Sequence, residues 1–292
     1  MNPIRKAVVA VAGSGTRFLP VTKAMPKEML PIVDKPIIQL VVEEIIEAGI
    51  QDIIFVTKWD KRPLEDHFDR NWALANELQK TGREDLLRNI DELCDNANFV
   101  FIRQRGPYGN GTPVLAAASL IGDEPFLYVW GDDLVKSSTS FSKQLVDDYS
   151  DHGLPVIGVQ EIPSEDIPRY GIVKLREGTR EIEDIVEKPS IADAPSRLAD
   201  FGRMILNSGV VDVLKRTQLG KGNELWIVDA IREYVRSGHK FLVKEVQDGN
   251  WLTTGDPLNY LRAVLLYALD RKGIGEELLS FLRGLVMDPV RK

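Results

Sequence analysis

The sequence predicts an α/β fold with a Rossmann-like, mostly parallel central sheet flanked by helices, and two observations lead to this fold class. Short apolar runs that suit buried strands alternate with amphipathic stretches through the first half of the chain. The segments between successive runs are long enough for the crossover helices that parallel strands require. The pattern therefore indicates repeated strand–helix–strand units.

The elements of the first half follow in chain order. We expect a helix over 36–48, because its apolar residues fall on one face, Pro36 suits its first turn and Gly49 suits the position after its end. Thr112, as the N-cap, and Pro113 open a second helix that runs to Leu120. The expected strands are 7–11, 53–57, 99–104 and 126–130.

The second half is a mixture of strands and helices. Strands are expected at 155–162, 171–175 and 181–187, and the last two suit a small hairpin that turns at Glu177-Gly178. The charged stretch at about 59–92 reads as a helical insertion, and 258–270 with 276–285 form a helical C-terminal tail. With no internal repeat or linker, we expect residues 1–292 to form a single domain.

Composition narrows the function classes. The chain has 292 residues, with 37 Lys and Arg against 44 Asp and Glu, giving a net charge of −7. This balance argues against a nucleic-acid partner or a membrane-surface partner, both of which need a basic footprint. No stretch approaches the ~20 apolar residues that span a bilayer. Cys94 is the single cysteine and the three histidines lie far apart, so the sequence predicts neither a disulfide nor a zinc site and favours a cytoplasmic location.

The loop after the first strand carries the strongest functional signal. Its sequence, VAGSGTRFLPVTKAMPKEMLP, covers 11–31. Gly13 and Gly15 let the backbone approach a ligand closely, and the loop amides can face phosphate oxygens. Arg17, Lys23 and Lys27 place three cations within the same short segment. An acidic protein that handles phosphates needs such a local concentration of positive charge.

Two common glycine-loop motifs do not fit this segment. The dinucleotide fingerprint needs a small third residue where Phe18 stands. The P-loop needs a Gly-Lys-Ser/Thr tripeptide, which does not follow these glycines. The loop therefore belongs to another class of phosphate site.

The segment resembles the signature of the sugar-nucleotidyltransferase (nucleotide pyrophosphorylase) family. Thr22-Lys23, the run Pro26 to Pro31 and Asp34-Lys35-Pro36 are similar to its uridylyl branch. The resemblance extends from about residue 4 to about residue 270 and is most specific in the first 40 residues. It implies that the main chain meets the nucleoside, that the loop holds the triphosphate, and that Glu28 lies in the nucleotide pocket. The nucleotide-binding positions implied are Ala12, Gly13, Gly15, Thr16 and Glu28, with Arg17 and Lys27 as catalytic cations.

Two further segments complete the nucleotide side. Gln104 and the loop Pro107 to Gly111 resemble the base-recognition loop of the family. A glutamine amide both donates and accepts, which matches the imide edge of uracil, and Gly109 would allow close contact with the base. This chain continues with Thr112 and Pro113 where the family has His-Ala, and Pro113 has no amide hydrogen to offer.

Asp132 is the expected metal ligand. The sequence Trp130-Gly131-Asp132-Asp133 ends a predicted strand, and ligand sites in open α/β sheets lie at the carboxyl ends of strands. Successive side chains of a strand point to opposite faces, so the two aspartates should have different roles. The resemblance assigns the metal to Asp132, and Mg²⁺ suits an oxygen site with few protein ligands.

The expected sugar-phosphate residues lie in the second half, and the C-terminal third departs most from the family. Gly171 and Glu187 resemble the positions that bind sugar hydroxyls, and Lys188 the position that neutralises the sugar phosphate. Trp226 suits either a core position or a platform for sugar stacking. Thr253 stands where relatives carry a second acidic metal contact, so either Asp256 substitutes or the contact is missing.

The resemblance implies Mg²⁺-dependent transfer of a uridylyl group from UTP to glucose 1-phosphate, giving UDP-glucose and pyrophosphate. One alternative is a thymidylyltransferase, or a uridylyltransferase for another sugar 1-phosphate. A second, of another class, is a non-catalytic regulatory paralogue that binds nucleotide sugars. Family habit suggests a homodimer or homotetramer.

Overall fold

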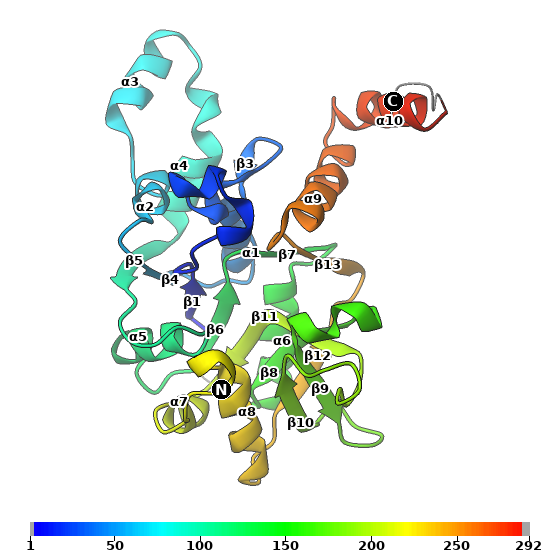
Figure 1. Cartoon of the computed structure of the whole chain (residues 1–292). Helices are drawn as coiled ribbons and strands as arrows, with labels where there is room; N and C mark the ends of the chain where they lie inside the picture. The colour runs from blue at the N-terminus through cyan, green and yellow to red at the C-terminus, as the bar shows by residue number, and fades with distance from the viewer. Residues whose placement is uncertain (1–2, 288–292) are drawn as a thin grey trace.

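A computed structural model describes residues 3–287 of the chain. The fold is mixed α/β, with a central sheet covered by helices, as the sequence predicts (Figure 1). Four strands form a parallel block at one side of this sheet in the order β6-β1-β4-β5. They are β1 (Lys6–Ala10), β4 (Asp52–Thr57), β5 (Asn98–Arg103) and β6 (Phe126–Trp130), which confirms the four strands predicted for the first half.

The second half adds strands around one long antiparallel strand, β11 (Leu198–Leu206). This strand pairs with β6, β8 (Val156–Glu161) and β9 (Gly171–Leu175), all antiparallel. β9 continues into β10 (Ile182–Glu187) as the predicted hairpin, and β12 (Leu242–Glu245) pairs with β8 in parallel. Two further short pairs, β2 (Pro31–Ile32) with β3 (Lys35–Pro36) and β7 (Asp133–Ser137) with β13 (Gly249–Thr253), lie outside the main sheet.

The predicted helices are present, and the structure contains further helices that the sequence did not predict. α1 (Ile37–Glu47) ends before Gly49, whose φ of +83° suits the residue after a helix. α5 (Thr112–Ile121) begins one residue earlier than predicted, with Gly111 at the N-cap position, and the Thr112 hydroxyl donates to Pro107 O instead of acting as the N-cap. The predicted helical insertion contains α2 (Arg62–His67), α3 (Trp72–Lys80) and α4 (Arg88–Asn96), and Figure 1 shows α3 projecting from the body. The remaining helices are α6 (Phe141–His152), α7 (Ser208–Leu214), α8 (Ile227–Arg236), α9 (Pro257–Leu269) and α10 (Gly275–Met287).

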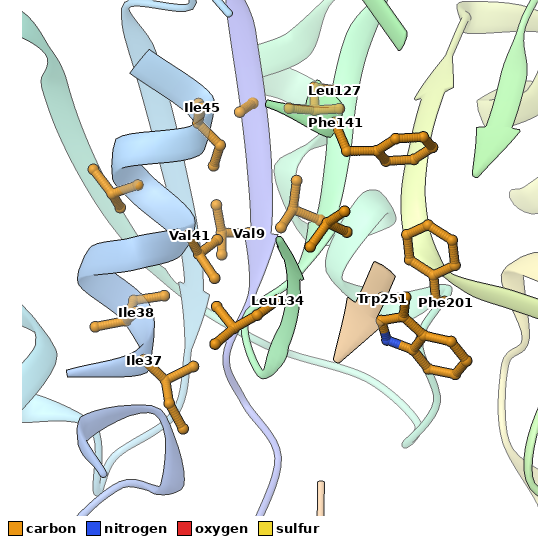
Figure 2. Packing of buried hydrophobic residues seen from close by; sticks show 14 of the residues in the cluster. Val9, Ile37, Ile38, Val41, Ile45, Leu127, Leu134, Phe141, Phe201 and Trp251 are labelled. Carbon is orange, nitrogen blue, oxygen red and sulfur yellow. The ribbon is translucent and has the colours of Figure 1, made fainter. Parts of the chain in front are cut away.

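The core lies on both faces of the sheet. On one face α1 packs Ile38, Val41 and Ile45 against strand residues such as Val9, and all four are fully buried (Figure 2). Trp251 stacks on Phe201 with ring centroids 5.2 Å apart, which ties β13 to the centre of the sheet. A buried Leu or Phe side chain contributes roughly 1.5–3 kcal/mol, so this packing fixes the strand ends that carry the polar residues described next.

The C-terminal helices leave the body of the molecule. Figure 1 shows α9 and α10 extending away from the sheet. Two polar contacts tie this arm to the β2–β3 hairpin: the Tyr260 hydroxyl donates to Pro31 O at 2.7 Å, and Arg271, just after α9, pairs with Asp34 in the turn of the hairpin. No helix within residues 3–287 is long and apolar enough to cross a membrane.

Candidate active site

Two cavities lie side by side over the carboxyl ends of β1 and β6, and they meet at Asp132. The first, of about 270 Å³, is lined by residues of the loop after β1 and of the segment after β5. The second, of about 190 Å³, is lined by residues of the β9–β10 hairpin and the turn after β13. Trp130, Asn110 and Asp132 line both. We call them the nucleotide-side cavity and the sugar-side cavity, after the roles that the sequence predicts for their residues.

The structure brings most of the predicted site residues to these two cavities. The nucleotide-side cavity is lined by Ala12, Gly13, Lys27, Glu28, Gln104, Gly109 and Asp132. The sugar-side cavity is lined by Arg17, Asp132, Gly171, Glu187 and Lys188. Gly15 and Thr16 line neither cavity. Gly15 adopts a φ of +63° and its carbonyl accepts from the Thr22 hydroxyl, so Gly15 shapes the turn of the loop.

Lys27 and Asp132 form the ion pair at the junction of the cavities. The Lys27 ammonium contacts Asp132 Oδ2, and both side chains are about one-fifth exposed. Burial alone would lower the pKa of Lys27, but the carboxylates of Asp132 and Glu28 raise it above its ordinary value. Burial likewise acts to raise the pKa of Asp132, and Lys27 outweighs it and lowers that pKa. Both groups are therefore charged at neutral pH, as the chemistry of a phosphate site requires.

Glu28 forms a second, fully buried ion pair beneath Lys27. The Lys61 ammonium donates to Glu28 Oε2 at 2.7 Å, and the two residues are 2% and 0% exposed. Within the described chain Glu28 Oε1 has no hydrogen-bond partner. Burial raises the pKa of Glu28 despite the two lysines. Sequence reasoning placed Glu28 in the nucleotide pocket but missed Lys61, which lies on the far side of a crossover connection.

Asp132 and Asp133 make different contacts, in line with the alternation of strand side chains. Asp133 is buried and lines only the sugar-side cavity, where its Oδ1 accepts from Trp251 Nε1 at 2.8 Å. Burial, with Asp132 next, raises the pKa of Asp133 to about 7. The carbonyl of Asp133 accepts from Arg203, which is itself fully buried. Asp133 is thus part of the support beneath the site.

The turn after β13 forms part of the wall of the sugar-side cavity and contacts both Asp132 and Arg17. Thr254 binds the Asp132 carbonyl twice, through its backbone N–H at 3.1 Å and its hydroxyl at 2.6 Å. The Arg17 guanidinium donates to Gly255 O at 3.0 Å. The backbone of this turn therefore positions both the acidic ligand and one of the predicted cations.

The segment after β5 behaves partly as predicted. Gln104 Nε2 lies 3.5 Å from Pro107 O, which leaves the amide at the rim of the nucleotide-side cavity. Gly109 has a φ of +116°, and a Cβ placed there would lie 2.2 Å from Leu225 O. The lack of a side chain at Gly109 therefore permits the close approach of the Leu225 backbone. Gly109 also lines the nucleotide-side cavity, and its contact with the base stays a prediction.

The sugar-side cavity contains a charged pair beside an aromatic ring. Lys188 contacts Glu187 Oε1 at 3.4 Å and lies 3.9 Å from the centre of the Trp226 ring. Trp226 is 8% exposed, lines this cavity and donates from Nε1 to Lys221 O, so it is both a core residue and part of the wall. Burial raises the pKa of Glu187 to about 7, although Lys188 opposes the shift.

Thr253 and Asp256 are the two residues that the sequence offers for the second acidic contact. Asp256 caps α9 by accepting from Asn259 N at 3.1 Å and also pairs with Arg169. Its carboxylate is therefore engaged at the start of the helix, and Asp256 is not among the residues that line the two cavities. Thr253 lines the sugar-side cavity, where its hydroxyl accepts from Gly255 N at 3.3 Å.

Asp132 is the carboxylate that lines both cavities, and its surroundings decide which kind of metal ion would fit there. Across residues 3–287, no three His, Cys, Asp or Glu side chains gather in a way that could hold a metal ion. Mg²⁺ is commonly held by one or two carboxylates together with substrate phosphates and waters. Asp132, at the junction of both cavities, fits that mode.

The arrangement as a whole is that of a nucleotidyl transferase site: cations from a glycine loop face an aspartate at the end of a neighbouring strand, between two cavities. The family model described as nucleotidyl transferase matches residues 6–268. The chain belongs to this family.

Two curated relatives indicate which kind of nucleotidyl transferase this chain is similar to. The chain is 44% identical over 287 residues to UTP–glucose-1-phosphate uridylyltransferase YngB of Bacillus subtilis, covering 97% of this chain and 96% of that protein. It is also 44% identical to the UTP–glucose-1-phosphate uridylyltransferase of Staphylococcus epidermidis, with 98% and 99% of the two chains covered.

Solved structures agree with these relatives. A UDP-glucose pyrophosphorylase complexed with UDP-glucose superposes with a TM-score of 0.83 at 38% identity, covering 92% of this chain and all of that one. The UTP-bound enzyme from Acinetobacter baumannii gives a TM-score of 0.87 at 34% identity, with 97% and 99% covered. A putative glucose-1-phosphate thymidylyltransferase from Bacillus anthracis, at 20% identity and with a TM-score of 0.70, shares the fold.

Proposed function

We propose that this chain is an enzyme that transfers a uridylyl group from UTP to glucose 1-phosphate, giving UDP-glucose and pyrophosphate. The observation that carries the proposal is the Lys27–Asp132 pair at the meeting point of two cavities. One cavity is lined by the loop and by Gln104, which suit a uracil nucleotide, and the other by Lys188 and Glu187, which suit a sugar phosphate. The 44% identity to two uridylyltransferases, which extends over nearly the whole chain, supports this choice of substrates.

The chemistry requires charge stabilisation more than acid–base catalysis. A phosphate oxygen of glucose 1-phosphate attacks the α-phosphorus of UTP, and the bond from that phosphorus to the bridging oxygen of pyrophosphate breaks in line. The nucleophile has a second pKa near ~6 and is ionised at neutral pH, so no general base is needed. Lys27 would bind the triphosphate and the departing pyrophosphate, and Lys188 the sugar phosphate. Arg17 lines the sugar-side cavity near Asp132, so it would reach the triphosphate from the side where the two cavities meet. The role of these cations is to hold two polyanions within reacting distance.

We propose Mg²⁺ as the cofactor, held by Asp132 together with substrate phosphates. When bound, the ion would neutralise phosphate charge that the lysines alone leave uncompensated. Lys27 contacts Asp132 Oδ2, so Lys27 and the ion would share this carboxylate. Thr253 offers a neutral hydroxyl beside it, which predicts a weaker metal site than one built from two carboxylates.

The test is pyrophosphate release measured over a panel of nucleoside triphosphates and sugar 1-phosphates, with and without Mg²⁺. We expect the highest kcat/KM for UTP with glucose 1-phosphate and loss of turnover in EDTA. A preference for dTTP would favour the thymidylyl alternative, and a preference for another sugar 1-phosphate would change the acceptor. Absence of turnover with every pair would favour a regulatory nucleotide-sugar-binding protein.

We also propose that the chain forms a homodimer or homotetramer in the cytoplasm. The projecting arm carries exposed apolar residues, among them Leu261, Leu265 and Phe281, which a second copy could cover. Cys94 is a free thiol, which suits a reducing compartment. Light scattering of the purified protein measures the oligomeric state, and a monomer at micromolar concentration would contradict the proposal.

A further inference from the structure

Lys188 and Trp226 form a cation–π contact in the sugar-side cavity that the mechanism above does not use. The Lys188 ammonium lies 3.9 Å from the centre of the Trp226 ring, well inside the ~6 Å within which a cation is attracted to the negative face of an aromatic ring. Both residues line the cavity. They come from segments far apart in the chain, the end of β10 and the N-cap position of α8, so the fold brings them together.

The Trp226 ring is fixed at this position by its surroundings. Trp226 is only 8% exposed, and its Nε1 donates to Lys221 O at 2.9 Å. The backbone N–H of the next residue, Ile227, donates to Asn110 Oδ1 at 2.9 Å. The ring is therefore part of a rigid wall, and the lysine side chain is the mobile partner of the contact.

The backbone of Lys188 is fixed as well. Its φ is +45°, in the left-handed region that residues other than glycine rarely adopt, and residues held in this way cluster at functional sites. Its N–H donates to Tyr170 O at 2.9 Å, and its carbonyl accepts from the Lys221 ammonium at 2.7 Å. Lys221 therefore binds both partners, because its side chain holds Lys188 and its carbonyl holds Trp226.

A ring and a carboxylate hold a lysine ammonium in different ways. Glu187 Oε1 lies 3.4 Å from the Lys188 ammonium and brings an opposite charge, which reduces the net charge offered to a phosphate. The face of Trp226 attracts the same ammonium without a net charge of its own. Immobilising a flexible side chain during binding costs roughly 2–10-fold in affinity. A ring that restricts Lys188 beforehand removes part of this cost and leaves its positive charge in place.

We propose that Trp226 is a positioning residue for Lys188, whose ammonium it holds in the sugar-side cavity for the phosphate group of the sugar 1-phosphate. Trp226 thereby acts on binding of the acceptor substrate and not on binding of UTP. This role also accounts for a tryptophan that is mostly buried and yet lines the cavity. The proposal rests on the proposed function and adds to it a residue that carries no charge itself.

The experiment is a double-variant cycle between Trp226→Leu and Lys188→Gln, measured as KM for glucose 1-phosphate. In the enzyme that retains Lys188, we expect Trp226→Leu to raise this KM roughly 3–10-fold and to change kcat and KM for UTP less than about twofold. In the Lys188→Gln background the same substitution adds less than about twofold, because no ammonium is left to position. Trp226→Phe, which keeps an aromatic face, raises KM less than Trp226→Leu does.

Two further measurements separate positioning from folding. Trp72→Leu is the matched control, because Trp72 also lies beside a cation, Arg70, but on the helical insertion. It leaves both KM values unchanged. Fluorinated tryptophans introduced at position 226 alone keep the shape of the ring and its N–H group, while each fluorine makes the ring face less negative. We expect KM for glucose 1-phosphate to rise with the number of fluorines, and this series decides the question if Trp226→Leu does not bind UTP.

An unchanged KM for glucose 1-phosphate in Trp226→Leu overturns the proposal. An equal increase in both backgrounds does the same, because a residue that contributes only packing does not depend on Lys188. A fluorine series with constant KM is the third contradicting result. Any of these results in an enzyme that makes UDP-glucose refutes the inference alone, whereas a wild type without uridylyl transfer refutes the proposed function.

Discussion

The two cavities differ in how their polar groups are satisfied before a substrate arrives. On the nucleotide side, Lys27 and Lys61 already have carboxylate partners, and one buried oxygen, of Glu28, is left over. On the sugar side, Glu187 has an oxygen without a partner in the described chain, and so has Asp200, which lies against Gly171. The first cavity is pre-organised by ion pairs for a highly charged triphosphate. The second is built on buried carboxyl groups whose oxygens the described residues do not fully satisfy.

The largest effect is expected from breaking the buried pair on the nucleotide side. Lys61→Met leaves Glu28 buried without its closest counter-charge, and removing one partner of a buried pair typically costs 3–5 kcal/mol of unfolding free energy. We expect a loss of about that size in urea denaturation. The double variant Lys61→Met/Glu28→Gln should recover most of it, because the uncompensated charge is gone. Unaltered stability of the single variant would show that Glu28 is neutral in the native protein.

The next effect tests the charge at the junction. Lys27→Ala should reduce kcat/KM by about 10²–10³, the usual cost of losing one group that stabilises transition-state charge. The fold should survive, because Lys27 is partly exposed. Lys23→Ala is the matched control: Lys23 lies in the same loop, is exposed and lines neither cavity. Near wild-type turnover of Lys27→Ala would refute its catalytic assignment.

A smaller and more selective effect is expected on the sugar side. Lys188→Gln removes a charge-assisted contact worth about 1.5–3 kcal/mol, so we expect KM for glucose 1-phosphate to rise roughly 10–100-fold. KM for UTP should change little, because Lys188 lines the sugar-side cavity. Steady-state kinetics with each substrate varied in turn measures both constants. Equal increases in both would contradict the division into two cavities.

The smallest effect concerns pH. The pKa of Asp200 is about 8 in the folded protein against 3.8 for a free aspartate, so the native state binds more protons than the unfolded state between these values. Asp200 therefore costs stability that is absent below about pH 4, grows as pH rises and is complete above about pH 8. Asp200→Asn should be more stable than the wild type at about pH 9, by at least about 1.4 kcal/mol, with no such gain at about pH 4. Parallel melting curves of the two proteins would contradict this titration.

The difference between the two cavities also explains which parts of the fold and of the site the sequence could predict. The loop from Ala12 to Glu28 is continuous in the chain, so its glycines and cations reveal a phosphate site without knowledge of the fold. The strands β1, β4, β5 and β6 are continuous apolar runs, so the sequence predicted them as well. β11 was missed because its central residues Asp200, Gly202 and Arg203 interrupt the apolar pattern, although all three are buried. Their burial is produced by contacts with distant segments, which a single sequence does not display.

Asp256 is an instructive exception, because a local signal for its role was present. An aspartate followed directly by a proline at the start of an amphipathic stretch is typical of an N-cap, and Asp256 does cap α9. The individual functions predicted for Arg17, Lys27, Gln104 and Glu187 stay predictions, since their positions suit those functions without testing them.

The turn at Thr254 and Gly255 has a consequence for biosynthesis. Asp132 and Arg17 are both held by backbone contacts to a segment that the ribosome synthesises long after them. A nascent chain can fold the sheet around β1 and β4 early, but its phosphate-binding groups stay unanchored until residues 253–255 emerge. The contacts that position Asp132 and Arg17 are therefore completed late in synthesis, when most of the chain has already been made.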